Sequence, residues 1–223
     1  MFPISDVIPS RTVPFVTVGL IIANALVFLY MITLPDAMLE RFVATYAVVP
    51  AWFSVPTLFT SQFLHAGWMH IIGNMLYLWI FGDNVEDRLG HFRYLLFYLG
   101  AGALAAILQV LFNPFSAVPM LGASGAIAGV MGAYFVLARR NRWDTSAIAA
   151  LIVVNLVISF ASPNIDWRAH VGGLVVGAAV GYGLARTMER RRRPAVSAAA
   201  GVAVFAAAVI PLVLLSLLPP GHA

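Results

Sequence analysis

Two side chains in this sequence have the chemistry of a nucleophile and its base, and each opens an apolar, glycine-rich run. Ser124 stands within Leu121–Gly129, and His170 stands within Arg168–Gly173. A hydroxyl group beside an imidazole that accepts its proton is a common arrangement for attack on a carbonyl carbon. If both runs are membrane helices, the two side chains lie at matching depths. The pattern therefore predicts peptide-bond hydrolysis within a bilayer.

The glycines around both residues recur at helical spacing, so that those of each run share one helix face. They are Gly122, Gly125, Gly129 and Gly132 near the serine, and Gly173, Gly177 and Gly181 after the histidine. Each glycine costs a helix about 1 kcal/mol relative to alanine, so a repeated face needs a packing reason. Close approach of two membrane helices is such a reason. It would bring Ser124 and His170 within hydrogen-bonding distance.

Two further polar residues, His70 and Asn74, are four positions apart and share one face of a predicted helix. They are candidate donors to the oxyanion that forms when a serine attacks a carbonyl, where one donor contributes about 2.7–4 kcal/mol. The backbone N–H groups before Ser124 suit the same role, because a helix amino terminus favours negative charge. The alternative is that His70 and Asn74 only join helices by hydrogen bonds. For His65 we favour a structural role in holding a loop.

The carboxylates do not form an obvious third member of a catalytic triad. Asp166 lies four residues before His170 and could orient it only if the helix extends that far back, so we prefer a two-residue dyad. The remaining charged residues near the second helix are expected to form a local salt-bridge and capping cluster in the following turn. These residues are Asp83, Glu86, Asp87 and Arg88.

The composition places the chain among all-α, polytopic membrane proteins. Of its 223 residues, 61% are hydrophobic and 10% are charged, against about 45–50% and about 25% in soluble domains. The absence of cysteine excludes disulfides, thiolate catalysis and cysteine-ligated metals, and we expect neither a metal nor a cofactor. The net charge of +4 does not indicate nucleic-acid binding, because the arginines lie between apolar runs, where they meet lipid head groups.

Apolar runs predict seven membrane helices, four of them short for a full span of about 20 residues. The predicted helices are Val13–Leu34, Met69–Phe81, Tyr94–Phe112, Ser124–Ala138, Ala147–Ala161, His170–Leu184 and Val196–Leu218. Eleven of the 13 arginines then fall on one side. By the positive-inside rule the amino terminus is cytoplasmic, and Ser124, His170 and His70 lie near the outer face. We read the first run as an uncleaved helix, because it is too long for a signal peptide.

Four motifs, in this order, resemble the rhomboid family of intramembrane serine proteases: His65-x4-His70-x3-Asn74, Glu86-Asp87-Arg88-Leu89-Gly90, Gly122-x-Ser124-Gly125 and Ala169-His170-x2-Gly173-x3-Gly177. The likeness runs from about residue 55 to 185. It implies a six-helix core, here residues 1–188, followed by a basic linker and an extra helix in residues 189–223. It also implies single-span membrane proteins as substrates and residence in a prokaryotic plasma membrane.

The resemblance assigns roles to the residues already singled out. It implies Ser124 as nucleophile, His170 as general base, and His70, Asn74 and the Ser124 N–H as the oxyanion site, which opens outward through a water-filled cavity. Two positions depart from the common pattern. Pro56-Thr57 replace a Trp-Arg pair, and Ala128 replaces an aromatic residue that stacks on the histidine in several members. We therefore expect His170 to be held by other contacts.

Two other functions fit part of the pattern. A catalytically inactive rhomboid-like protein would bind membrane helices, but the retained serine and histidine argue against it. A small transporter would place polar groups near the membrane midplane and often contains inverted repeats, and neither feature is visible. A metalloprotease is less favoured still, because the sequence has no His-Glu-x-x-His motif.

Overall fold

The structure is a computed structural model that describes residues 12–161 and 167–189, and these residues are predominantly helical. The elements in order are α1 (Phe15–Met31), α2 (Asp36–Tyr46), η1 (Pro50–Trp52), α3 (Thr57–Thr60), η2 (Ser61–Phe63), α4 (Trp68–Leu89), α5 (His91–Phe112), α6 (Ser124–Arg140), α7 (Ser146–Ala161) and α8 (Trp167–Glu189). The predicted all-α class is confirmed for this part of the chain. The predicted helix Val196–Leu218 lies outside the described residues.

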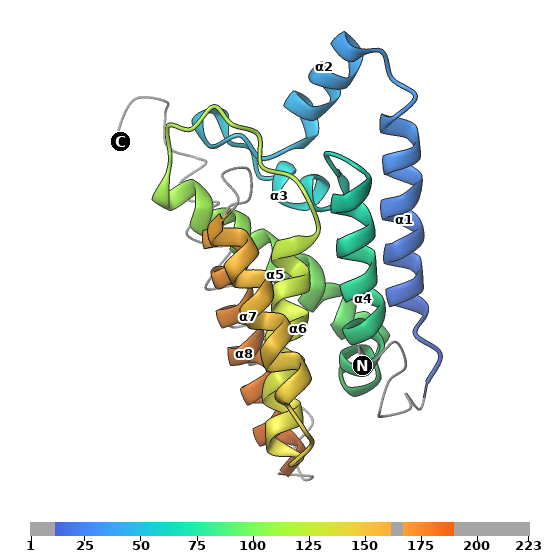
Figure 1. Cartoon of the computed structure of the whole chain (residues 1–223), viewed down its shortest axis with the longest axis vertical. Coiled ribbons are helices and arrows are strands. Elements are labelled where there is room, and N and C mark those ends of the chain that lie inside the picture. The colour runs from blue at the N-terminus through green and yellow to red at the C-terminus, as the bar shows by residue number, and fades with distance from the viewer. Residues whose placement is uncertain (1–11, 162–166, 190–223) are drawn as a thin grey trace.

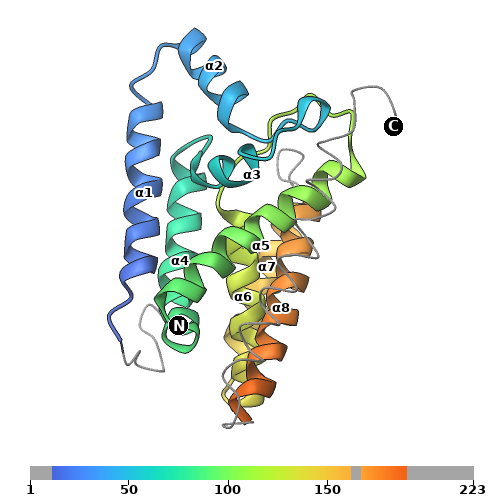
Figure 2. The ribbon, with the colours of Figure 1, turned by 180° about the vertical axis from the view of Figure 1, so that it is seen from behind.

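Helix α6 is the centre of the bundle. Every residue from Gly125 to Ala133 is buried, which is the pattern of a helix covered on all sides. Helix α8 lies along α6, α5 crosses both obliquely, and α4 separates α6 from α1 (Figures 1 and 2). The amino ends of α4, α6 and α8 lie at the same end of the bundle, below α2 (Figure 1). The bundle thus brings together the ends that carry the candidate site.

The contact between α6 and α8 is made by backbone rather than by side chains. A Cβ atom on Gly173 would lie 2.1 Å from the Gly125 carbonyl oxygen, and one on Gly177 would lie 1.8 Å from the Gly129 carbonyl oxygen. One turn further on, a Cβ atom on Gly181 would lie 2.8 Å from the Ala133 carbonyl oxygen. No side chain fits at these positions. The predicted packing role of the glycines in α8 is therefore observed directly.

Several predicted boundaries were wrong. The helix expected over Met69–Phe81 continues to Leu89 as α4, and the helix expected over His170–Leu184 is α8, which runs from Trp167 to Glu189. Helix α2 was not predicted, because its apolar residues alternate with charged ones in a short stretch. Helix α4 extends through charged residues because the most buried of them, Glu86, has partners outside its own helix. Within the expected local cluster, Glu86 pairs with His91 just after α4, but it also reaches α1, which the sequence did not indicate.

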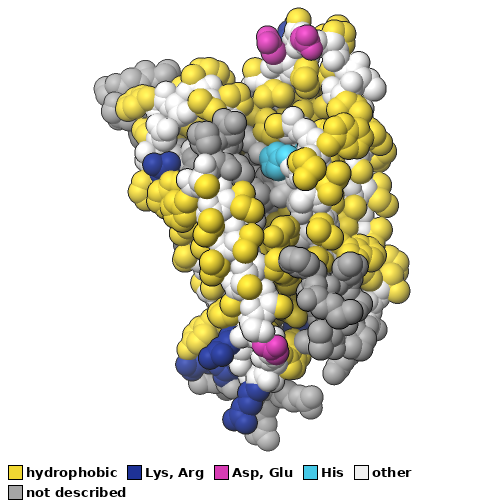
Figure 3. All heavy atoms as spheres, in the orientation of Figure 1, with side chains coloured by type: hydrophobic (Ala, Val, Ile, Leu, Met, Phe, Trp, Pro, Cys, Tyr) yellow, Lys and Arg dark blue, Asp and Glu magenta, His cyan; other side chains and the backbone are white. Residues whose placement is uncertain are grey.

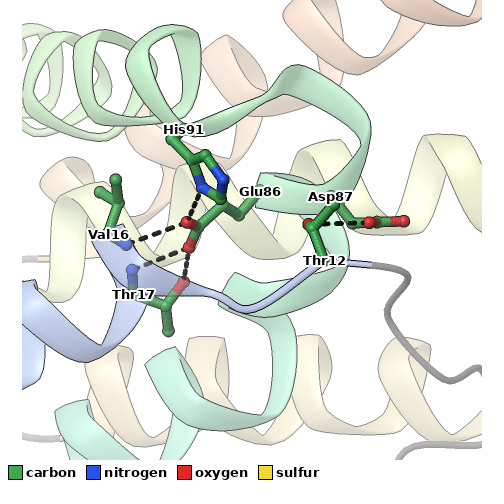
Figure 4. A network of polar contacts seen from close by, with 6 residues as sticks. All are labelled: Thr12, Val16, Thr17, Glu86, Asp87 and His91. Carbon is green, nitrogen blue, oxygen red and sulfur yellow. Dashed lines mark hydrogen bonds and ion pairs between the residues drawn. The ribbon is translucent and has the colours of Figure 1, made fainter.

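Glu86 joins three helices through its carboxylate (Figure 4). It is fully buried and accepts hydrogen bonds from the Val16 N–H at 2.9 Å, the Thr17 N–H at 2.8 Å and the Thr17 hydroxyl at 2.7 Å. The His91 Nδ1 atom, in the first turn of α5, lies 2.6 Å from Glu86 Oε1. Glu86 therefore caps the amino terminus of α1, where a negative charge is favoured by the helix dipole.

Apolar side chains cover the flanks of the bundle, and arginines gather at the lower end in Figure 3. That end holds Arg139 and Arg140 in the last turn of α6 and Arg186 in the last turn of α8. Large exposed hydrophobic residues include Ile22, Leu26, Leu29, Ile72, Leu76, Trp79, Val153, Val157 and Val175. Within the described residues, α5 alone is both long and apolar enough to cross a membrane, while α1 and α7 are apolar but shorter.

We predict that Gly177→Ala destabilises the fold far more than Gly183→Ala, although both glycines lie in α8. The new Cβ atom would meet the Gly129 carbonyl oxygen, which cannot rotate away, so the cost should exceed the roughly 1–3 kcal/mol of ordinary overpacking. Gly183 has open space around its Cβ position, and alanine there should gain about 1 kcal/mol of helix propensity. Thermal unfolding in detergent measures both; equal melting temperatures would contradict the backbone contact.

We also predict that Glu86→Gln lowers the free energy of unfolding by about 3 kcal/mol, because a neutral amide cannot accept all the hydrogen bonds of the buried carboxylate. The matched control is Asp87→Asn. Asp87 accepts an exposed hydrogen bond from Thr12 at 3.0 Å, and its loss should cost less than about 1 kcal/mol. Chemical unfolding in mixed micelles compares them, and a Glu86→Gln protein as stable as the control would exclude the bridging role.

Candidate functional site

Ser124 is the first residue of α6, as predicted, and it is half-buried. The helical hydrogen bonding begins where the Ile127 N–H donates to the Ala123 carbonyl at 3.0 Å. The N–H groups of the preceding residues therefore stand at the amino end of a helix, where they favour an anion. A nucleophile at this position lies beside donors that suit the oxyanion produced by its own attack.

The loop before Ser124 is fixed from both sides. The Gly122 N–H donates to the Ser61 carbonyl at 2.9 Å, and Met120 exchanges backbone hydrogen bonds with Val48 at 2.7 and 3.0 Å. Gly122 has φ +122°, a conformation that a residue with a side chain rarely adopts. These bonds hold the backbone that leads into Ser124 in one conformation.

This loop lies against His70 and Asn74 of α4. A Cβ atom on Gly122 would be 2.7 Å from His70 Nε2 and 3.8 Å from Asn74 Nδ2. His70 is half-buried and Asn74 is buried. The structure thus brings the polar face of α4 against Gly122, which lies two residues before Ser124 in the chain.

His65 holds Asn74 in place. The Asn74 Nδ2 group donates to His65 Nε2 at 3.0 Å, and the His65 and His70 rings meet edge to face with centroids 4.9 Å apart. Burial, together with the neighbouring His70, lowers the pKa of His65 from 6.5 to about 4. His65 is therefore neutral at physiological pH, as an acceptor at Nε2 must be. The expected structural role of His65 corresponds to this contact.

His170 lies in the first turn of α8 and is buried. Its Nδ1 atom is 2.5 Å from the hydroxyl oxygen of Ser159, near the end of α7. Beside it, the Ala169 carbonyl oxygen is 3.8 Å from the Cβ position of Gly125. The first turns of α6 and α8 are therefore in contact, and α7 supplies a polar partner for the imidazole.

Sequence reasoning did not identify Ser159. It is one of two serines in an apolar helix and lies four residues after Asn155, and a polar pair at that spacing in α7 was the available signal. Asp166, the other residue considered near His170, lies outside the described residues. Ala128 is buried in α6, and its Cβ atom would be 3.2 Å from a Cβ atom on Gly173. The small side chain of Ala128 therefore lies where α6 and α8 pack closely.

The described residues contain no group of three or more His, Cys, Asp or Glu side chains arranged to hold a metal ion. The chemistry available at the site is that of a hydroxyl group, imidazoles, an amide and backbone N–H groups.

We predict that Gly122→Ala slows covalent labelling of Ser124 by a fluorophosphonate, because a methyl group would be strained at this φ and would displace the His70 ring. The control is Gly67→Ala, at the start of α4, where φ is 175° and the Cβ position is open. We expect a rate about 5- to 150-fold slower for Gly122→Ala only, which corresponds to a strain of about 1–3 kcal/mol. Equal rates for both variants would show that His70 does not need this loop geometry.

Comparisons with known proteins identify the family of this chain. The family model described as the rhomboid domain matches residues 52–187. The chain is 41% identical over 134 residues to rhomboid protease GluP of Bacillus subtilis (strain 168), covering 57% of this chain but only 26% of that protein. It is 34% identical over 139 residues to the putative rhomboid protease YdcA of the same strain, covering 60% of this chain and 69% of YdcA.

A third relative extends the likeness along the sequence. The chain is 27% identical over 199 residues to rhomboid protease GlpG of Salmonella choleraesuis (strain SC-B67), covering 86% of this chain and 70% of GlpG. The domain match spans more than half of the chain and includes the four motifs from His65 to Gly177. The chain belongs to the rhomboid family of integral membrane proteins.

Proposed function

We propose that this protein is an intramembrane serine endopeptidase that cleaves the membrane-spanning segments of single-span proteins. Three bacterial relatives of this chain are named rhomboid protease or putative rhomboid protease. This chain retains a hydroxyl, two site imidazoles and an amide in the order that the family motifs require. Ser124 is the nucleophile, His170 is the general base, and His70 and Asn74 stabilise the oxyanion.

The observation that carries the proposal is the register between α6 and α8. The carbonyl oxygens of Gly125, Gly129 and Ala133 oppose Gly173, Gly177 and Gly181, a constant offset of 48 residues. At the same offset, Ser124 is level with Gly172, two residues or about 3 Å along the axis from His170. Helices held this close by glycine can place the two side chains within reach of each other.

The positions of His70 and Asn74 support their assignment as hydrogen-bond donors to the oxyanion. In the attacked state the substrate carbonyl oxygen becomes negative, and donors already in place stabilise it without reorganisation. The loop at Gly122 puts His70 Nε2 next to the amino end of α6. Asn74 has two N–H bonds, of which one reaches His65 and the other is available to an oxyanion.

The reaction follows from these roles. A substrate helix enters from the lipid and unwinds locally, because a peptide bond in a regular helix is poorly exposed to attack. Ser124 attacks the carbonyl carbon while His170 takes the hydroxyl proton and then gives it to the departing amine. Water deprotonated by His170 hydrolyses the acyl-enzyme and restores Ser124. Half-burial of Ser124 and His70 is compatible with access for that water.

The same proposal places the site in the membrane. The apolar flanks of the bundle face lipid, and the arginine-rich ends of α6 and α8 face the cytoplasm of a prokaryotic cell. Ser124 and His170 start the helices that end in those arginines, so the site opens toward the outer face. A lipid environment also explains why α1, α4 and α7 expose large hydrophobic side chains.

We predict that Ser124→Ala abolishes cleavage of a fluorogenic single-span substrate in liposomes, with a loss of at least about 10³-fold, because both the nucleophile and its hydrogen bond are removed. His170→Ala should cause a loss of similar size. The matched control is Ser146→Ala, which alters another serine at a helix amino terminus, exposed and far from the site. It should retain full activity.

Two results would overturn the proposal. Undiminished cleavage by Ser124→Ala would refute the assignment of the nucleophile. A folded wild-type protein that neither cleaves any tested membrane segment nor reacts with a fluorophosphonate would instead be an inactive rhomboid-like helix binder. The labelling experiment separates these cases, since a reactive Ser124 is labelled even when no tested substrate fits.

A further inference from the structure

We propose that Ser159 is a positioning residue that fixes the tautomer and orientation of His170. The effect of Ser159 on catalysis rests on the proposed function. The position of the proton on the His170 ring does not, because it can be measured in an inactive protein. The inference starts from a serine that is 1% exposed in an apolar helix and whose hydroxyl contacts the Nδ1 atom of the imidazole.

The Ser159 hydroxyl has two partners in the structure. Its oxygen is 2.6 Å from the Asn155 carbonyl oxygen, one turn earlier in α7. It is also 2.5 Å from His170 Nδ1. A carbonyl oxygen can only accept, so a hydroxyl that contacts it must donate its single proton there. Toward His170 the Ser159 oxygen then offers only lone pairs.

Proton counting fixes the state of the imidazole. An oxygen that offers lone pairs needs a donor, so Nδ1 of His170 carries a hydrogen and donates it to Ser159. In a neutral imidazole the other nitrogen, Nε2, is then bare and can accept. This arrangement makes two hydrogen bonds, whereas the opposite tautomer keeps only the one from the hydroxyl to Nδ1. Nε2 is thus left as the base for Ser124.

The contact also suits the protonated state. When His170 takes a proton from Ser124, Nδ1 keeps its hydrogen and its bond to Ser159 becomes charge-assisted, which strengthens it. Ser159 thereby orients the imidazole and supports its protonated form, a role that a carboxylate fills in serine proteases with a triad. A hydroxyl provides the orientation without placing a second charge in the bundle.

Neighbouring side chains keep the two groups together. Phe160, next to Ser159, stacks on Trp167 with ring centroids 4.9 Å apart and an interplanar angle of 28°. This stack joins the end of α7 to the start of α8, the two helix ends that also carry the Ser159–His170 hydrogen bond. Ala128 offers only a methyl group on α6, whereas Ser159 offers a hydroxyl to Nδ1.

The first test measures the proton position directly. Protein labelled with ¹⁵N-histidine in the Ser124→Ala background gives ring nitrogen shifts that are assigned by comparison with Ser124→Ala/His170→Ala. We expect His170 to be protonated at Nδ1 and bare at Nε2, and Ser159→Ala to shift it toward a mixture of tautomers. A His170 protonated at Nε2 with Ser159 intact would overturn the proposal, whatever the activity of the protein.

The second test asks whether the contact matters for the reaction. Ser159→Ala should lower kcat by about 10- to 100-fold, the loss typical when a group that orients a metal-bound imidazole is removed, with KM nearly unchanged. Ser159→Thr keeps the hydroxyl and should restore most of kcat, and Ser146→Ala in the same helix is the control for serine removal. Equal kcat for Ser159→Ala and wild type would overturn the role.

Two comparisons keep the interpretations separate. If Ser159→Ala and Ser159→Thr lose activity together with thermal stability, the residue serves packing and the proposal fails. If cleavage survives in Ser124→Ala while the Nδ1 tautomer is observed, the proposed nucleophile fails and the Ser159 contact stands.

Discussion

The close approach of α6 and α8 is the constraint on which the rest of the bundle depends. Three backbone contacts, from Gly125–Gly173 to Ala133–Gly181, set both the separation and the register of the two helices. Dispersion at such short range and weak Cα–H···O contacts compensate for the low helix propensity of glycine. Because the register is constant along about two turns, it also fixes the relative height of the first turns, where Ser124 and His170 lie.

The opposite flank of the bundle is held together by hydrogen bonds to a buried carboxylate. There the carboxylate of Glu86 gathers the amino terminus of α1 and the first turn of α5 around the end of α4 (Figure 4). A buried carboxylate is costly unless all its acceptor sites are used, and here three donors besides His91 meet it. This junction lies at the other end of α4 from His70 and Asn74, so it anchors the helix without taking part in the site.

The sequence predicted the elements whose pattern is local. Apolar runs located α1, α5, α6 and α7, and glycine spacing indicated the α6–α8 contact. The local patterns of the sequence did not predict contacts between residues that are distant in the chain. Glu86 looked like part of a local cluster because its partner Thr17 is 69 residues away. The positive φ of Gly122 and the pairing of Ser159 with His170 likewise arise from tertiary packing, although their residue types were visible.

The use of Ser159 rather than a carboxylate follows from where His170 lies. The imidazole is buried between apolar helices, where an ionised acid costs several kcal/mol unless further donors surround it. A serine whose proton already binds the Asn155 carbonyl presents a directed acceptor with no net charge. In the low dielectric of the bundle this neutral hydrogen bond is stronger than in water. In the proposed mechanism, a backbone carbonyl of α7 thus fixes the serine that orients the base.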